Sequence, residues 1–298
     1  MSHQAGTRAG SRHRRPLVLA LALVSVFMVV EIVAGVLTGS LALLSDAGHM
    51  ATDALGIGMA LAAILAADRA VGAGGRTFGV YRLEILAALA NAILLFAVSG
   101  YVIWEAFSRL ADPPEVAAVP MLVVAVVGLA VNVVAWLLLR GGARESLNVR
   151  GAHLEVLGDL IGSLGVIVAG LITLTTSWPY ADALVAGLVG VLILPRAARL
   201  GAEATRVLIQ AAPPGLDVDQ MRAALRSIDG VDDVHDLHVW TLTSEMEVVS
   251  AHVAMEGGSS PQTVLDDARA LLEHRYGITH ATLQVETGSQ RYLCEIGW

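Results

Sequence analysis

The chain has 298 residues, of which 55% are apolar and only 15% are charged. This apolar fraction is too high for an ordinary soluble protein. The formal net charge of −8 argues against nucleic acid as a partner, because nucleic-acid binding requires a basic surface. The acidity is concentrated in residues 213–298, which hold 14 acidic residues and five Arg, and the one cysteine, Cys294, excludes an internal disulfide.

Six apolar segments follow one another along the first two thirds of the chain. A membrane-spanning helix needs roughly 20 mostly apolar residues. The segments are Pro16–Thr38, Leu41–Ala67, Leu83–Phe107, Val116–Leu139, Leu154–Thr176 and Trp178–Leu194. The last is the shortest and is expected to stop before Pro195. The sequence therefore predicts an N-terminal tail of residues 1–15 and an all-α membrane domain of six transmembrane helices within residues 16–200.

Arginine residues alternate between the connections of these segments. They precede the first segment, lie between the second and third and between the fourth and fifth, and follow the sixth. The opposite connections hold only Arg109. Because Arg and Lys accumulate on the cytoplasmic side of a membrane protein, both termini are expected in the cytoplasm.

The C-terminal part, residues 213–298, reads as a water-soluble domain after a linker of residues 201–212. Two helices are predicted, the first capped by Asp217 and the second by Ser260, with Gly277 after its last turn. Strands are predicted at Val231–Thr243, Met246–Met255 and His280–Glu286. The order helix, strand, strand, helix, strand predicts a small α/β domain of ferredoxin-like type.

Ionisable side chains occur inside two of the apolar segments, where they are costly and usually functional. The second segment contains Asp46, His49 and Asp53, and the fifth contains Glu155 and Asp159. A spacing of four residues separates His49 from Asp53, and also Glu155 from Asp159, so each pair lies on one helix face. Two facing pairs supply the four nitrogen and oxygen ligands that suit tetrahedral zinc. The sequence predicts a metal site between these helices.

Other interpretations of the polar residues remain open. Glu31 could form a structural hydrogen bond to a neighbouring helix, and Asn91 and Asn132 are expected to form interhelical hydrogen bonds rather than to bind metal. Asp46 could be an accessory group of the metal site or an acid near water at a helix end. The spacing also suits a cation channel or an intramembrane metalloenzyme. An enzyme is not expected, because the H-E-x-x-H motif is absent and no nucleophile set is apparent.

Four stretches of the chain carry a resemblance to a known family. They are Glu31–Asp53, which includes Ser-Asp-Ala-Gly-His; Phe78–Glu84; Val156–Asp159; and Val234–Trp240, with the sequence Val-His-Asp-Leu-His-Val-Trp. In this order, and over nearly the whole chain, they resemble the cation diffusion facilitators. The likeness is to the bacterial zinc, cobalt and cadmium exporters and to the vertebrate zinc transporters of that family.

The resemblance implies a homodimer in the bacterial plasma membrane. Each protomer would combine six helices with a cytoplasmic metallochaperone-like domain, and would exchange a divalent metal leaving the cytoplasm for a proton entering it. The implied partners are Zn²⁺, protons and membrane lipid, with no nucleic acid. His49 and Asp53 match the family's ligand pair in the second helix, and Asp159 matches the carboxylate of the fifth.

Glu155 departs from the pattern of zinc-selective relatives, which commonly have a histidine at that position. His153 cannot replace it, because six residues from Asp159 is about 240° around the helix. One imidazole with three carboxylates favours harder ions such as manganese, while the nitrogen keeps zinc, cobalt and cadmium plausible. Zinc is the expected substrate. Manganese, cobalt, cadmium or iron as main substrate, and a membrane metal sensor without flux, are the alternatives.

The resemblance also implies a metal site in the cytoplasmic domain. His235, His252 and Glu286 occupy matching places, and Cys294 resembles a terminal thiolate ligand. His238 and His280 of this domain are expected to be surface or packing residues.

Overall fold

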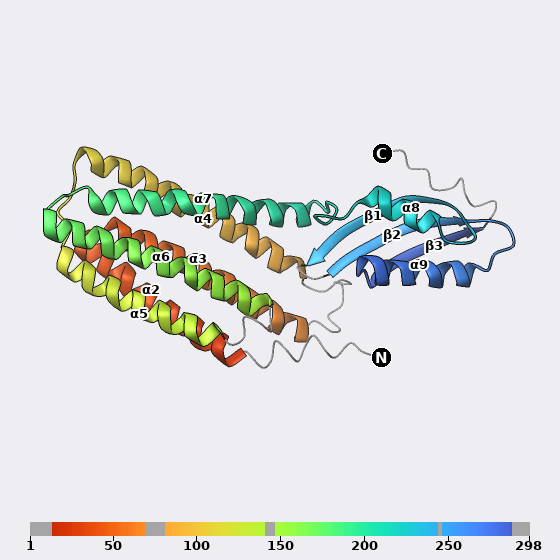
Figure 1. Ribbon diagram of the computed structural model, residues 1–298, viewed down its shortest axis with the longest axis horizontal. Coiled ribbons are helices and arrows are strands. Elements are labelled where there is room, and N and C mark those ends of the chain that lie inside the picture. The colour runs from red at the N-terminus through yellow and green to blue at the C-terminus, as the bar shows by residue number, and fades with distance from the viewer. Residues whose placement is uncertain (1–13, 70–80, 141–146, 244–245, 288–298) are drawn as a thin grey trace. The chain divides into compact units, whose positions relative to one another are not determined.

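The computed structural model describes residues 14–69, 81–140, 147–243 and 246–287. The chain divides into two compact units (Figure 1). Most of one unit consists of six long helices, which confirms the predicted all-α membrane domain. They are α2 (Arg14–Thr38), α3 (Leu41–Arg69), α4 (Tyr81–Ala111), α5 (Ala118–Arg140), α6 (Leu147–Thr176) and α7 (Ala181–Leu208).

The side chains of the helical unit are distributed as a bilayer requires. Leu37 and Phe107 are 79% and 69% exposed, whereas Glu31 and Asp159 are only 1% exposed. Lipid covers such an apolar surface, while polar groups must find partners inside the bundle. Within the described residues, α2, α4, α5, α6 and α7 are long and apolar enough to cross a membrane. The sixth helix, α3, is of similar length and carries the ionisable residues of the predicted metal site.

The prediction that the last segment stops before Pro195 is wrong. The helix α7 continues through Pro195 to Leu208. A proline inside a helix removes one hydrogen bond and crowds the preceding turn, but packing by a neighbouring helix can compensate. Here Ile193 and Ala197, two residues to either side of the proline, are buried against Leu95 of α4.

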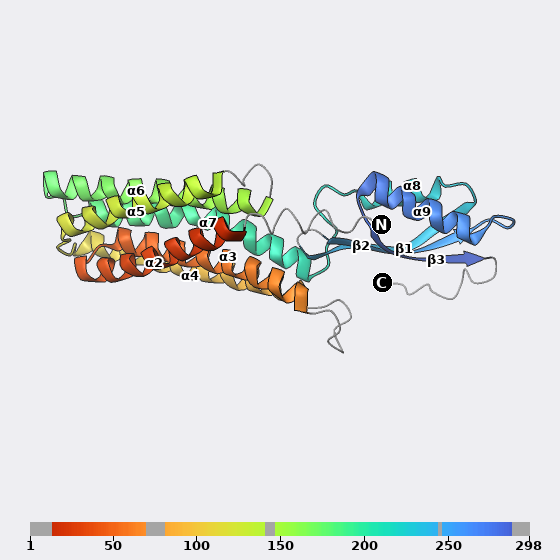
Figure 2. The same cartoon turned by 90° about the horizontal axis from the view of Figure 1, so that it is seen from below.

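Four helices form a closed ring in the helical unit. The helix α2 packs on α3 and α5, and α6 packs on the same two helices from the other side (Figure 2). One buried apolar cluster of the ring includes Leu43, Met121 and Val166, and a second includes Met50 and Leu139. Buried polar residues of α3, α5 and α6 fall between members of the first cluster and members of the second, among them Asp46, His49, Asn132, Asp159 and Ser163.

One carboxylate fixes the turn between α2 and α3. Gly39 ends α2 with a φ of +72°, a conformation that favours glycine. At the start of α3, Asp182 accepts hydrogen bonds from Ser40 Oγ at 2.6 Å, Leu41 N at 2.6 Å and Ala42 N at 3.2 Å. Asp182 lies in the first turn of α7, so a side chain of one helix satisfies the free N–H groups of another.

Arg109, near the end of α4, completes this connection. Its Nη1 donates to the carbonyl oxygen of Gly39 at 2.6 Å and lies 3.8 Å from Asp182 Oδ2. Its Nε donates to Glu105 Oε1 at 2.9 Å. The guanidinium therefore balances the Asp182 carboxylate and binds the end of α2. Together the two residues join the ends of four helices.

The C-terminal unit has the predicted order of elements and the expected small α/β fold. It consists of α8 (Val218–Arg226), β1 (Val231–Thr243), β2 (Met246–Met255), α9 (Pro261–Tyr276) and β3 (His280–Thr287). The strands are ordered β1-β2-β3, with β1 antiparallel and β3 parallel to β2. Asp217 caps α8 as predicted, whereas Ser260 occupies the N-cap position of α9 without a side-chain hydrogen bond.

The two short helices pack on one face of this sheet (Figure 2). Their buried residues, among them Leu225 and Leu272, contact Val234, Val249 and Val253 of the strands. Because successive residues of a strand point to opposite faces, the residues next to these valines lie on the face away from the helices. That face carries the polar residues of the predicted cytoplasmic site.

Replacing Asp182 by Ala should destabilise the helical unit by about 1 to 3 kcal/mol, because three buried donors lose their acceptor. The measurement is the midpoint of thermal unfolding of the detergent-solubilised protein. Asp112→Ala, which removes an exposed acid from the connection after α4, should leave the midpoint unchanged. Equal midpoints for the two variants would contradict the role of Asp182.

Candidate functional site

The structure brings together two of the predicted ligands of the membrane site. His49 of α3 and Asp159 of α6 are buried, with 8% and 1% of their surfaces exposed. The distance from His49 Nε2 to Asp159 Oδ1 is 3.6 Å. Two ligand atoms of one tetrahedral zinc lie about 3.4 Å apart, given metal–ligand bonds near 2.0 Å. The pair therefore has the spacing of two ligands of one ion.

The other two predicted ligands are placed only by their backbones. Asp53 lies one turn after His49 in α3, and Glu155 lies one turn before Asp159 in α6. The side chains of Asp53 and Glu155 lie outside the described residues, as does the whole of Cys294. A site with four ligands therefore stays a prediction.

Further polar residues lie beside this pair inside the helical ring. Asn132 of α5 donates from Nδ2 to Ser163 Oγ of α6 at 3.2 Å, which confirms its expected interhelical hydrogen bond. Ser163 in turn donates to Asp46 Oδ2 of α3 at 3.4 Å. Sequence reasoning missed Ser163, since a serine in an apolar helix carries no signal beyond its polarity.

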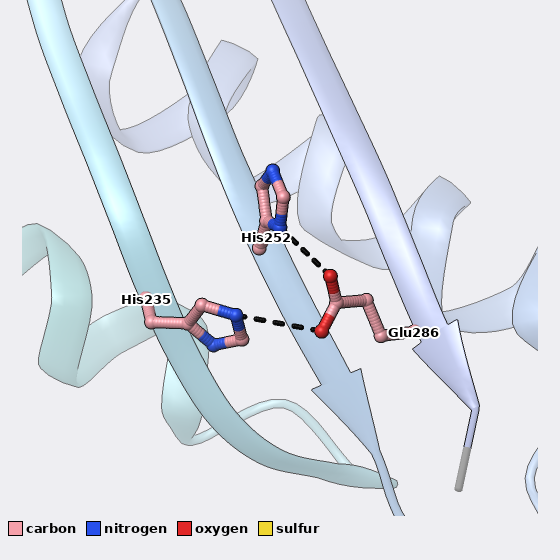
Figure 3. A group of neighbouring side chains, drawn as sticks. All are labelled: His235, His252 and Glu286. Atoms are coloured by element: carbon pink, nitrogen blue, oxygen red, sulfur yellow. Dashed lines mark hydrogen bonds and ion pairs between the residues drawn. The ribbon is translucent and has the colours of Figure 1, made fainter. Parts of the chain in front are cut away.

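The cytoplasmic site is assembled by the register of the sheet. His235 of β1 is directly opposite His252 of β2, and Glu286 of β3 lies diagonally from His252 (Figure 3). His235 Nε2 is 3.4 Å from Glu286 Oε2, and His252 Nδ1 is 2.7 Å from Glu286 Oε1. Their ligand atoms all lie within 4.8 Å of one another. Within the described ranges, no other three His, Cys, Asp or Glu side chains meet that limit.

Asp233 places a carboxylate beside the ring of His235. Its Oδ2 lies 3.8 Å from His235 Nδ1, the nitrogen that faces away from Glu286. Burial raises the pKa of Asp233, but hydrogen bonds from Arg226 and from the Val234 N–H, together with the charge of Arg226, outweigh burial and hold the pKa below its ordinary value. An ionised Asp233 favours a proton on Nδ1, which leaves Nε2 available for a metal.

A bulge in β1 adds a second carboxylate beside His252. The register shifts between His235 and His238, and Asp236 has a φ of +50° there, a conformation that Asp tolerates better than most residues. Asp236 Oδ1 lies 2.8 Å from His238 Nε2, and Asp236 Oδ2 lies 3.9 Å from His252 Nε2. His238 is exposed, as expected of a surface residue. The sequence did not reveal the bulge.

Comparison with known families gives matches for both units. The cation efflux transmembrane domain matches residues 17–209, and the cytoplasmic domain of cation efflux proteins matches residues 213–288. The chain belongs to the cation efflux family. The predicted resemblance to cation diffusion facilitators is confirmed.

Members of the cation efflux family with similar sequences have names that refer to metals. The metal cation efflux system protein CzcD of Cupriavidus metallidurans is 42% identical, over 92% of this chain and 87% of its own length. The zinc transporter ZitB of Escherichia coli is 39% identical, over 96% and 91%. The cadmium, cobalt and zinc/H(+)-K(+) antiporter of Bacillus velezensis is 36% identical, over 96% and 94%.

In the full-length protein, His252→Ala should abolish tight zinc binding at the cytoplasmic site, because one of three clustered ligands is lost. Asp233→Ala should weaken that binding by about 10- to 100-fold, since it leaves the His235 ring without its orienting carboxylate. Competition with a zinc chelator, in a background carrying Asp159→Ala, measures both effects. Affinity should fall as pH is lowered, because protons compete with the metal for imidazole.

The control for these variants is His274→Ala, which removes an exposed imidazole from α9. In the Asp159→Ala background, His274→Ala should leave the zinc affinity of the cytoplasmic site unchanged. Loss of affinity in His274→Ala equal to that in His252→Ala would show that the cluster is not the site.

Proposed function

We propose that the protein exports a divalent transition metal, first of all Zn²⁺, from the cytoplasm in exchange for protons. It acts as a homodimer in the bacterial plasma membrane, with both termini in the cytoplasm. Manganese, cobalt, cadmium and iron are the alternative main substrates. The metal is the cargo of this reaction, and the membrane site holds it between the two sides.

The observation that carries the proposal is the buried contact between His49 and Asp159. An imidazole and a carboxylate from different helices meet in a region that lipid surrounds, at a distance that suits one shared ion. Burying these groups is unfavourable unless they are paired or bind a metal. Zinc, which appears in the names of two of the similar proteins, agrees with this donor set.

Proton exchange follows from the chemistry of the same ligands. Metal binding requires a neutral imidazole and ionised carboxylates, so protons and metal compete for one site. When the site opens to the side with more protons, the ligands take up protons and release the metal. His49 and the carboxylates of the site are the candidate proton carriers, because each must be free of its proton to bind the metal.

Transport by the purified protein in proteoliposomes separates this proposal from its alternatives. An exporter moves Zn²⁺ faster when the pH gradient is imposed and moves protons in the opposite direction. A channel would conduct the metal without proton movement. A membrane metal sensor would bind zinc through His235, His252 and Glu286 and show no flux at all.

Asp159→Ala should abolish zinc transport, because the carboxylate that faces His49 is removed. The variant should remain a membrane-inserted dimer, which size-exclusion chromatography in detergent checks. Asp112→Ala, whose acid lies outside the ring, should transport at the wild-type rate. Normal transport by Asp159→Ala would show that the site is misassigned.

Glu155→His should shift the preference toward zinc and away from manganese, since a second nitrogen ligand replaces an oxygen ligand. The measurement is the ratio of zinc to manganese transport rates in the same proteoliposomes. An unchanged ratio would count against Glu155 as a ligand.

A further inference from the structure

A second set of polar side chains lies inside the helical ring, next to the transport site. It contains one residue from each helix of the ring: Glu31 of α2, Asp46 of α3, Asn132 of α5 and Ser163 of α6. None of the four is more than 2% exposed. We call these four residues the second polar layer.

The second polar layer lies on the side of the transport site that faces the α2–α3 turn. Asp46 precedes His49 by three residues in α3, which begins at that turn. Ser163 follows Asp159 by four residues in α6, which runs in the opposite direction. A helical turn rises about 5.4 Å, so the two sets are separated by about one turn.

Three oxygen atoms in the second polar layer have no hydrogen-bond partner among the described residues. They are both carboxylate oxygens of Glu31 and the Oδ1 of Asn132. Asn132 uses its Nδ2 for Ser163, which donates to Asp46. Glu31 interacts directly with the Asp46 carboxyl group. Two buried carboxyl groups that face each other repel unless a cation or a proton lies between them.

The backbone of the ring is shaped to admit these two carboxylates. A Cβ atom at Gly162 of α6 would lie 2.6 Å from Asp46 Oδ1, and one at Gly128 of α5 would lie 2.6 Å from the Phe27 ring and 3.2 Å from Glu31 Oε1. Any larger residue at Gly162 would displace the Asp46 carboxylate. Glycine at position 162 lets Asp46 approach α6 closely, and glycine at position 128 leaves room on α5 for both Phe27 and Glu31.

We infer that the second polar layer is a further binding position for the transported divalent cation, which the ion occupies between the His49–Asp159 site and the α2–α3 turn. This inference rests on the proposed function. The donors are the carboxylates of Glu31 and Asp46 and the amide oxygen of Asn132, and the Ser163 hydroxyl orients Asp46. A hydrogen bond between the carboxyl groups of Glu31 and Asp46 requires a proton on one of them, and in this proposal the cation takes the place of that proton.

The donor chemistry gives the layer a role in release. All of its donors are oxygen atoms, which bind zinc less tightly than a set that includes an imidazole. An ion that moves from the His49 site to this layer therefore moves to a weaker site. Movement through a membrane protein requires sites that are strong enough to admit the ion and weak enough to release it.

The test is the number of Zn²⁺ ions bound per protomer by the full-length protein in detergent, measured by equilibrium dialysis against Zn²⁺. Glu31→Gln should lose one ion relative to the wild type, and Asp159→Ala should lose a different one. The double variant should therefore lose two. Glu203→Gln, a matched change at an exposed position of α7, should lose none. Asp46→Asn should reproduce the loss in case Glu31→Gln does not fold.

Two outcomes would overturn the inference. If the double variant loses only one ion, then Glu31 belongs to the transport site and there is no second position. If Glu31→Gln keeps every ion and alters only the pH dependence of zinc transport, the layer holds a proton instead. Absence of transport by the wild-type protein would count against the proposed function alone, since the ion count still decides whether two positions exist.

In proteoliposomes, Glu31→Gln should lower the maximal rate of zinc transport by about tenfold or more, the scale on which metal-site neighbours act. The zinc concentration for half-maximal rate should change little, because loading still occurs at His49 and Asp159. A changed half-maximal concentration with an unchanged maximal rate would contradict a role in release.

Discussion

The helical unit contains buried acids, and a carboxylate inside a bilayer needs a partner. Glu31, Asp46 and Asp159 are all buried inside a ring of four helices whose outer surface is apolar. Lipid offers no water to solvate a carboxylate, so each acid needs a donor, an opposite charge or a metal. The closed ring, the hydrogen bonds through Ser163 and the glycine at position 162 all serve this requirement. A divalent cation can serve as the partner of these acids and can also be released from them.

The two units bring the proposed metal ligands together by different means. In the membrane, His49 and Asp159 come from helices that cross the whole unit, so their distance depends on helix packing. In the C-terminal domain, hydrogen bonds between strands fix the register that sets His235 opposite His252 and near Glu286. The first arrangement can change when helices move. The second is held by the sheet and suits an ion that stays bound.

The sequence predicted most of the helices and strands and the charged candidates for metal ligands. It did not predict features that depend on contacts between residues far apart in the chain. Segment length and polarity predicted six helices, and the four-residue spacing singled out His49 and Asp159. The helix α7 continues past Pro195 because α4 packs against it, which no local pattern reports. Ser163 and Asp182 were missed for a similar reason. Asp182 binds Ser40, which lies 142 residues away in the sequence, and a single acid at a helix start has ordinary explanations.

The carboxylate of Asp182 also restricts how the bundle can move. It holds the first N–H groups of α3 while belonging to α7, and Arg109 attaches α4 to the same point. Sliding α3 along its axis would break several charged hydrogen bonds at once. Helices joined in this way pivot more readily than they translate. A tilt of α3 about the α2–α3 turn would keep these contacts and would displace the far end of the helix, beyond His49, more than its start.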